Sequence, residues 1–253
     1  MKSLSPSEWH NRFIQQAGWT AQLRTFIFRQ LNLTNSASIL EIGSGTGVVL
    51  SEIGSAKTAL RIALDLRFDF LRYSCQVHPK LWHLNANGFH LPFGTDAIST
   101  TLCHFLLLWV QDPIDMISEM RRVTKPGGFV VALAEPDYGG RIDHPAELVH
   151  LGQRQAKALL NQGANPYLGR KLHGLFHQAG LENVQSGILG GHWGEPPSPE
   201  AWDSEWNTLE QDLAGSISVE EFHNLRQLDA AAWQKGERIL FVPTFYAWGS
   251  VPE

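Results

Sequence analysis

The sequence predicts an α/β protein with a doubly wound sheet of parallel strands, and three observations support this. Short apolar runs alternate with stretches of helical periodicity, which is the pattern of β-α-β units. The first apolar run, residues 38–42, leads directly into a glycine-rich turn. The 253 residues, 43% hydrophobic and 18% charged, suffice for one generous α/β domain.

The elements follow in order along the chain. Residues 7–31 place apolar side chains at helical spacing, which predicts one or two amphipathic helices with a break at Gly18. Strands are expected at 38–42, 60–66, 81–84, 98–103 and 128–134, and the clearest helix among them at 113–123. Further on, helices are expected at 145–162 and 169–179, a sixth strand at 183–189, a helical stretch at about 194–235 and a seventh strand at 238–248. Pro243 cannot donate to a ladder, so this seventh strand is predicted to be an edge or to bulge there.

Composition excludes several classes of function. The formal charge is −5 and Lys and Arg form no block, which argues against duplex nucleic acid as a partner. Cys75 and Cys103 lack metal-ligand spacing and no carboxylate or histidine cluster has it, so no metal is expected. No run of 18 uncharged apolar residues and no signal-peptide core are present, which predicts a cytoplasmic protein without a membrane span. The oligomeric state is left open.

The turn after the first strand reads Glu41-Ile-Gly43-Ser-Gly45-Thr-Gly47. Its glycines allow positive φ and let a ligand approach the backbone. The dinucleotide fingerprint needs a further glycine where Val48 stands. Glu41 would repel a diphosphate but attract a cationic amino-acid group. The turn therefore favours S-adenosylmethionine over a nicotinamide or flavin dinucleotide.

From this turn onward the chain resembles the class I S-adenosylmethionine-dependent methyltransferases, especially the small-molecule branch that includes the quinone C-methyltransferases. Asp65 ends the second strand, where the family holds both ribose hydroxyls of the cofactor. Residues 87–93, Asn-Gly-Phe-His-Leu-Pro-Phe, are similar to the family's Asp-Ala-x-x-Leu-Pro-Phe, whose first residue binds the adenine amino group. Here Asn87 replaces Asp, and its carbonyl can still accept that bond. Residues 125–128, Lys-Pro-Gly-Gly, match the turn before the family's fifth strand, and the resemblance covers about residues 36–190.

The resemblance implies a Rossmann-like sheet of seven strands with the last one antiparallel. It also implies four segments: an N-terminal helical cap (1–35), the cofactor-binding core (36–190), a helical lid insertion (191–236) and the final strand of the core (237–253). S-adenosyl-L-methionine is the implied cofactor. The residues expected to bind it are Glu41, Gly43, Gly45, Gly47, Asp65, Leu66, Asn87, Gly88 and Cys103.

Side chains for the acceptor must come from the carboxyl ends of the strands. His104 follows the fourth strand and is a candidate general base, and Asp137 after the fifth strand is the second catalytic candidate. The residues expected to bind the acceptor are Trp109, Glu135, Tyr138 and Arg141. For Asp137 and Arg141 the alternative is that they pair and fix the loop.

The expected function is metal-independent methyl transfer to a small molecule, at oxygen, nitrogen or carbon. One alternative is a nicotinamide-dependent oxidoreductase, which would need the glycine missing at Val48 and a Tyr-x-x-x-Lys motif. The other is a regulatory protein that binds S-adenosylmethionine without catalysis. The long connection before the seventh strand contains Trp193, Trp202, Trp206 and Trp233. We expect it to pack with the N-terminal helices as a lid over the acceptor pocket, the alternative being a surface decoration or a dimer contact.

Overall fold

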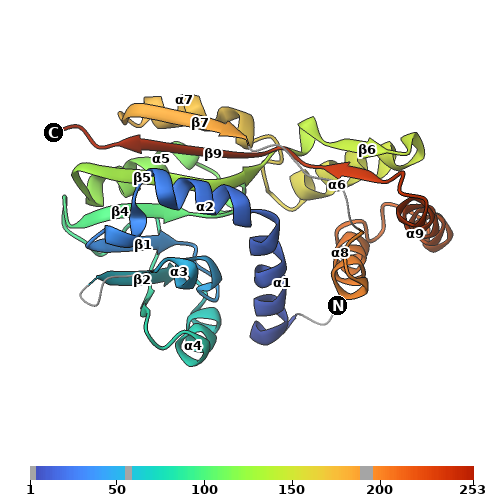
Figure 1. The fold of residues 1–253 in the computed structure, drawn as a ribbon, viewed down its shortest axis with the longest axis horizontal. Coiled ribbons are helices and arrows are strands. Elements are labelled where there is room, and N and C mark those ends of the chain that lie inside the picture. The colour runs from blue at the N-terminus through green and yellow to red at the C-terminus, as the bar shows by residue number, and fades with distance from the viewer. Residues whose placement is uncertain (1–3, 55–58, 189–195) are drawn as a thin grey trace.

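The computed structural model describes residues 4–54, 59–188 and 196–253, and its central sheet lies between two layers of helices (Figure 1). The sheet has seven strands in the order β3-β2-β1-β4-β5-β9-β7. Neighbours are parallel, except that β9 is antiparallel to β5 and β7. This confirms the predicted Rossmann-like sheet. Its strands are β1 (Ser38–Ile42), β2 (Leu60–Asp65), β3 (Trp82–Asn85), β4 (Ile98–Cys103), β5 (Thr124–Pro136), β7 (Glu182–Ile188) and β9 (Thr244–Ser250).

Four of the described α-helices, α1, α5, α8 and α9, begin at a side chain that caps them. Ser5 and Glu8 form a capping box at the start of α1, and Asp112 accepts from the N–H of Asp115 at the start of α5. The helices of the described residues are α1 (Pro6–Trp19), α2 (Ala21–Gln30), α3 (Val48–Glu52), α4 (Phe68–Val77), α5 (Pro113–Val123), α6 (Val149–Asn161), α7 (Leu172–Gln178), α8 (Pro199–Asp212) and α9 (Val219–Gln234).

Alternation along the strands divides the core between the two faces of the sheet. Ile39, Leu102 and Val131 pack with residues of α1, α2 and α3. Leu40 and Val130, one position along their strands, pack on the other face with residues of α5 and α7. Successive strand residues point to opposite faces, so a strand with helices on both sides must be apolar throughout.

The segment predicted as one final strand is divided in two, and the expectation of an edge or a bulge at Pro243 is wrong. Before Pro243, β8 (Ile239–Phe241) pairs with β6 (Ile142–His144) in a separate two-stranded sheet. After it, β9 lies inside the main sheet between β5 and β7. Proline lacks the N–H that a ladder needs, and the chain leaves one sheet and joins another at this residue.

Other boundaries differ by small amounts. The break between the N-terminal helices is at Thr20, whereas Gly18 remains inside α1. β3 begins one residue later than expected, and β5 is longer because Thr124 already pairs with Ile98 of β4. The long connection contains α8 and α9, and α8 shares a small apolar core with α6. Trp193 lies outside the described residues.

Candidate active site

The glycine-rich turn joins β1 to α3 at the carboxyl edge of the sheet. Gly43, Gly45 and Gly47 have φ of +68°, +53° and +78°, a region that favours glycine. A Cβ atom on Gly43 would lie 2.7 Å from the Leu106 side chain, and one on Gly45 would lie 2.7 Å from the Phe13 ring. The turn therefore requires glycine both for its backbone and for the close approach of its neighbours.

Glu41 supplies a buried carboxyl group next to this turn. It is 2% exposed, and its Oε2 accepts the N–H of Leu50 in α3 at 3.2 Å. Burial raises the pKa of Glu41 to about 8. An adjacent cation would favour the charged form, so this carboxyl group is suited to a cationic amino-acid group.

Asp65 connects the end of β2 to the glycine-rich turn. Its Oδ2 accepts the Gly45 N–H at 2.7 Å, and its Oδ1 accepts the Arg67 N–H at 2.8 Å. Burial raises the pKa of Asp65, while these two backbone bonds act in the opposite direction. The next residue, Leu66, is 72% exposed. A half-buried carboxylate followed by an open apolar side chain suits a ribose with an attached base.

Asn87 and Gly88 stand beside Asp65. The N–H of Ala86 bonds to the Asp65 carbonyl, and the exposed Asn87 accepts the Phe89 N–H through its side-chain oxygen at 3.0 Å. A Cβ on Gly88 would lie 2.7 Å from Ile42. This tight packing holds the segment against β1 and leaves the Asn87 amide open for a ligand.

The helix α1 covers the glycine-rich turn from outside (Figure 1). Its His10 contacts Thr46 at 2.8 Å between Nδ1 and Oγ1, and its Phe13 ring lies against Gly45. On its other side, Arg12 pairs with Glu205 of α8 at 3.0 Å. The helix thus links the turn to the long connection.

The fourth strand ends at Cys103 and His104, which have different surroundings. Cys103 is fully buried, and burial raises the pKa of its thiol well above the usual value. Its side chain belongs to the core beside α5. His104 Nε2 lies 2.8 Å from Thr20 Oγ1, and burial with the nearby Arg24 lowers the pKa of His104 to about 3. The imidazole is therefore neutral at pH 7, and its low pKa makes it a weak base.

A large groove begins at the carboxyl ends of β4 and β5. Its volume is about 1620 Å³, and Trp109 and Tyr138 line it together with residues of α1, α6 and α8. Trp109 is 48% exposed. Burial raises the pKa of Tyr138 to about 12, so the phenol keeps its proton. Two of the four residues expected to bind the acceptor thus meet in one groove.

Glu135, the third residue expected to bind the acceptor, is bonded to the protein backbone. It is fully buried at the end of β5, and its carboxyl oxygens accept the backbone N–H groups of Leu106, Leu107 and Leu108 at 2.8–3.1 Å. Burial raises the pKa of Glu135 to about 8. The side chain holds the segment that carries Trp109, and in this structure it has no oxygen turned to an acceptor.

Asp137 and Arg141 are not paired with each other, and each pairs with another residue. Asp137 accepts the N–H groups of Gly139 and Gly140 and pairs with Arg170. Arg141 pairs with Asp143 at 2.6 Å, and both side chains are nearly inaccessible. These contacts fix the loop after β5, and the catalytic role predicted for Asp137 has no geometric support.

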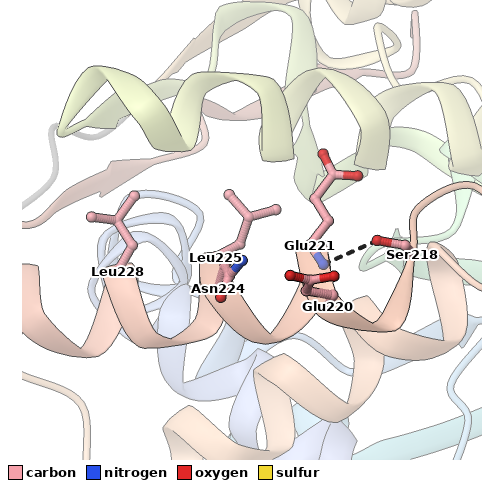
Figure 2. Close-up of a pocket in the computed structure, with 6 residues that line it drawn as sticks. All are labelled: Ser218, Glu220, Glu221, Asn224, Leu225 and Leu228. Atoms are coloured by element: carbon pink, nitrogen blue, oxygen red, sulfur yellow. Dashed lines mark hydrogen bonds between the residues drawn. The ribbon is translucent and has the colours of Figure 1, made fainter.

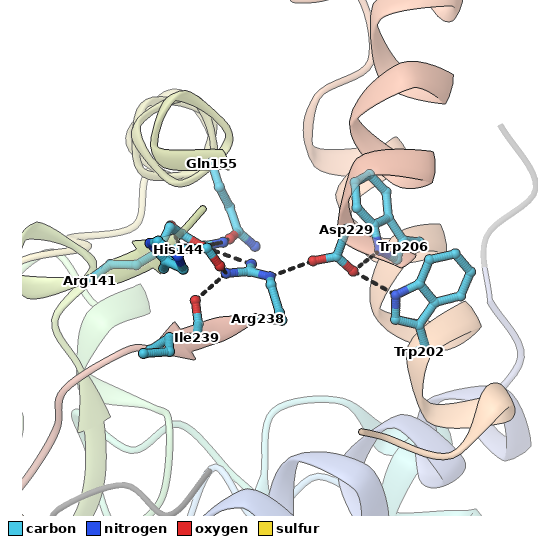
Figure 3. A network of polar contacts seen from close by, with 9 residues as sticks. Arg141, His144, Gln155, Trp202, Trp206, Asp229, Arg238 and Ile239 are labelled. Atoms are coloured by element: carbon cyan, nitrogen blue, oxygen red, sulfur yellow. Dashed lines mark hydrogen bonds and ion pairs between the residues drawn. The ribbon is translucent and has the colours of Figure 1, made fainter. Parts of the chain in front are cut away.

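The groove wall formed by α8 is anchored by a buried polar network (Figure 3). Asp229 of α9 accepts both indole N–H groups of Trp202 and Trp206, at 2.6 and 3.0 Å. It also pairs with Arg238 at 2.5 Å. Arg238 pairs in turn with Asp143 at 2.8 Å. Sequence reasoning missed Arg238 and Asp229, because residues 143, 229 and 238 share no local motif.

A smaller hollow of about 310 Å³ lies along α9 (Figure 2). Its Ser218 caps the helix by accepting the Glu221 N–H at 3.1 Å, and Glu221 pairs with Arg154 at 2.7 Å. Its polar groups are thus used in the fold. Within residues 4–54, 59–188 and 196–253, no three His, Cys, Asp or Glu side chains gather as metal ligands. No helix in those ranges has the length and apolarity needed to cross a membrane.

Comparisons with known proteins identify the family of the chain. Residues 40–132 match the model of the family described as a methyltransferase domain. Demethylmenaquinone methyltransferase of Lysinibacillus sphaericus is 34% identical over 191 residues, 68% of this chain and 80% of that protein. An uncharacterized methyltransferase of Schizosaccharomyces pombe is 37% identical over 87 residues, 34% of this chain and 31% of that protein. The chain thus spans four fifths of one relative and less than a third of the other.

The fold has a close counterpart among solved structures. A Thermotoga maritima protein, described as a SAM-dependent methyltransferase and possible histamine N-methyltransferase, superimposes with a TM-score of 0.58. The match covers 97% of this chain and 95% of that one at 15% identity, and supports the fold alone. With the bacterial relative and the family model, the conclusion is direct: the chain belongs to the class I methyltransferases and is an enzyme that uses S-adenosyl-L-methionine.

Proposed function

We propose that this methyltransferase acts on a small-molecule acceptor bound in the groove between α1, α6 and α8. The observation that carries the proposal is the position of the groove. It starts at Trp109 and Tyr138, which follow the carboxyl ends of β4 and β5. In open α/β sheets, ligands bind at the carboxyl ends of the strands. A concave site of this size is ample for a metabolite.

The walls of the groove combine polar and apolar side chains. Many of the lining side chains are amides, among them Gln15, Gln155 and Gln162. Trp109 offers a flat apolar surface at the inner end, and the Tyr138 hydroxyl a hydrogen-bond donor. The name of the bacterial relative, a demethylmenaquinone methyltransferase, is compatible with a small acceptor. The acceptor atom stays open among oxygen, nitrogen and carbon.

We assign cofactor binding to the residues around the glycine-rich turn. The cofactor supplies an electrophilic methyl group on its sulfonium. The Gly43–Gly47 backbone would hold its amino-acid end beside Glu41, Asp65 its ribose, and Asn87 with Leu66 its adenine. The chain contributes alignment and exclusion of water, which is the main requirement of an in-line transfer. Because α1 contacts both the turn and α8, it is suited to shield both ligands.

The test is a screen of aromatic and polar metabolites for formation of S-adenosylhomocysteine, followed by Trp109→Ala with the best acceptor. We expect the acceptor KM to rise at least about tenfold, equivalent to 1.4 kcal/mol, with the cofactor Kd unchanged. Trp82→Ala is the matched control, because Trp82 is exposed at the opposite end of the sheet. Methylation of a protein or nucleic acid, with no metabolite accepted, would overturn the proposal.

A further inference from the structure

Three polar side chains connect α2 to the end of β4, and the first two are buried. Arg24 and Thr20 are 2% and 3% exposed. Thr20 Oγ1 lies 2.5 Å from Arg24 Nη1 on one side and 2.8 Å from His104 Nε2 on the other. The chain of contacts ends at the same sheet edge as the glycine-rich turn.

The direction of each hydrogen bond follows from the donors available. A guanidinium group can only donate, so Thr20 Oγ1 accepts from Arg24. Its single hydrogen must then go to another acceptor. The Ala17 carbonyl is 3.4 Å away and already receives Arg24 and the Thr20 N–H. His104 Nε2 is nearer, at 2.8 Å, and this shorter contact favours donation of the Thr20 hydroxyl to it over donation to the Ala17 carbonyl.

Arg24 is held as a fixed donor. Its guanidinium pairs with both carboxylate oxygens of Glu52 at 2.6–3.0 Å. If His104 were protonated, two cations would point N–H groups at one hydroxyl. Among the described charged groups, Arg24 is the one that lowers the pKa of His104 in addition to burial. Two carboxyl groups interact with Arg24: Glu41 of β1 by electrostatic attraction and Glu52 of α3 by direct hydrogen bonds.

We propose that Arg24 and Thr20 are positioning residues that keep His104 as a neutral hydrogen-bond donor, with its proton on Nδ1. Among the described residues, Nδ1 makes no hydrogen bond, so its N–H is available to a ligand. The inference rests on the proposed function for the identity of that ligand, a polar atom of the acceptor or the cofactor. It also removes His104 as the general base, because the Nε2 lone pair is already in use. The acceptor must then arrive as a nucleophile or lose its proton to another group.

The test is nitrogen NMR of histidine-labelled protein, with the His104 signals assigned by their loss in His104→Gln. We expect a protonated Nδ1 and an unprotonated Nε2, with no titration of His104 between about pH 5 and 8. In Thr20→Val, the pKa of His104 should rise, because the hydrogen bond that stabilises the neutral imidazole is lost while burial and Arg24 still act on it, and Thr20→Ser should restore the original state. Thr25→Val is the control, because the exposed Thr25 hydroxyl bonds only its own helix.

Two results would overturn the inference: a proton on Nε2 in the unaltered enzyme, or a Thr20→Val spectrum identical to it. Neither depends on the acceptor, so an error in the proposed function is detected separately. With an acceptor known, kcat/KM should be independent of pH in this range for the unaltered enzyme. Thr20→Val should lose rate at a higher pH than the unaltered enzyme, because its imidazole gains a proton more readily once the hydroxyl no longer donates to Nε2.

Discussion

The cofactor side and the acceptor side of this enzyme are built by different means. On the cofactor side, the groups proposed to bind the ligand are backbone and side chains at strand ends, joined by short bonds such as that between Asp65 and Gly45. On the acceptor side, α8 and α9 are held by buried charges, with Asp229 and Arg238 at the centre. The first arrangement depends on backbone conformation, and the second on charge pairs between distant segments.

This difference teaches where specificity can change. The glycine-rich turn tolerates little substitution, because each glycine combines positive φ with a close neighbour. The lining of the groove consists of exposed faces of α1, α6 and α8, and these faces can vary while the network behind them holds the wall. We therefore expect substitutions to be tolerated poorly in the glycine-rich turn and more readily in the lining of the groove.

The largest effect is expected from Asp229→Asn. The substitution leaves Arg238 with one carboxylate fewer in a buried site, and breaking a buried pair costs about 3–5 kcal/mol. Denaturant unfolding followed by tryptophan fluorescence should register it, since Trp202 and Trp206 contact Asp229. Asp203→Asn is the control, as the exposed pair of Asp203 with Arg226 contributes at most about 1 kcal/mol. Equal losses in both variants would show that the network is not what anchors the wall.

The second effect concerns the cofactor side. Asp65→Ala should weaken S-adenosylmethionine binding by about 1.5–3 kcal/mol per charge-assisted hydrogen bond lost, measured by calorimetry. Asp69→Ala removes an exposed carboxylate that pairs only with the neighbouring Arg67 and should leave the affinity intact. An unchanged Kd for Asp65→Ala with a normal melting temperature would exclude Asp65 from the site.

Glu135→Gln separates a structural role from a binding role. A glutamine cannot accept all three N–H bonds that Glu135 now receives, and an unsatisfied buried N–H costs about 1–3 kcal/mol. We expect Glu135→Gln to lower the melting temperature. Glu182→Gln, at an exposed position, should leave the melting temperature unchanged. A raised acceptor KM with unchanged stability would instead return Glu135 to the acceptor site.

The smallest effect expected is none at all. Once an acceptor is known, methyl transfer should proceed in excess EDTA, because Asp137 and Asp143 are paired with arginines and Glu135 with backbone N–H groups. Activity lost in EDTA and restored by Mg²⁺ would reveal a metal site among these carboxyl groups.

The sequence predicted the sheet and the glycine-rich turn after its first strand because both depend on local patterns. Apolar runs identify buried strands. The glycine-rich turn is recognised directly from its glycines at alternate positions around Gly45. Even Pro243 was recognised as incompatible with a ladder, although its consequence is a change of sheet and not a bulge.

The acceptor side was harder to predict for a physical reason. Glu135 and Asp137 stand at the expected strand end. In the folded chain, Glu135 binds backbone N–H groups and Asp137 pairs with an arginine, and the spacing of residues in the sequence does not reveal these partners. The same holds for His104, whose behaviour depends on Thr20 and Arg24, more than 75 positions away. A position on a strand end predicts proximity to the site, but only the contacts show whether a side chain is free to act.

The place of β9 has a consequence for how the chain acquires its fold. β9 is inserted between β5 and β7, so a nascent chain that has reached only β7 exposes the long edge of β5 and leaves β7 without its partner. Unpaired strand edges invite association with other chains, and pairings between distant segments form slowly. Synthesis therefore passes through a stage in which the cofactor side is complete in sequence while the sheet is still open, and this stage is where chaperones would matter most.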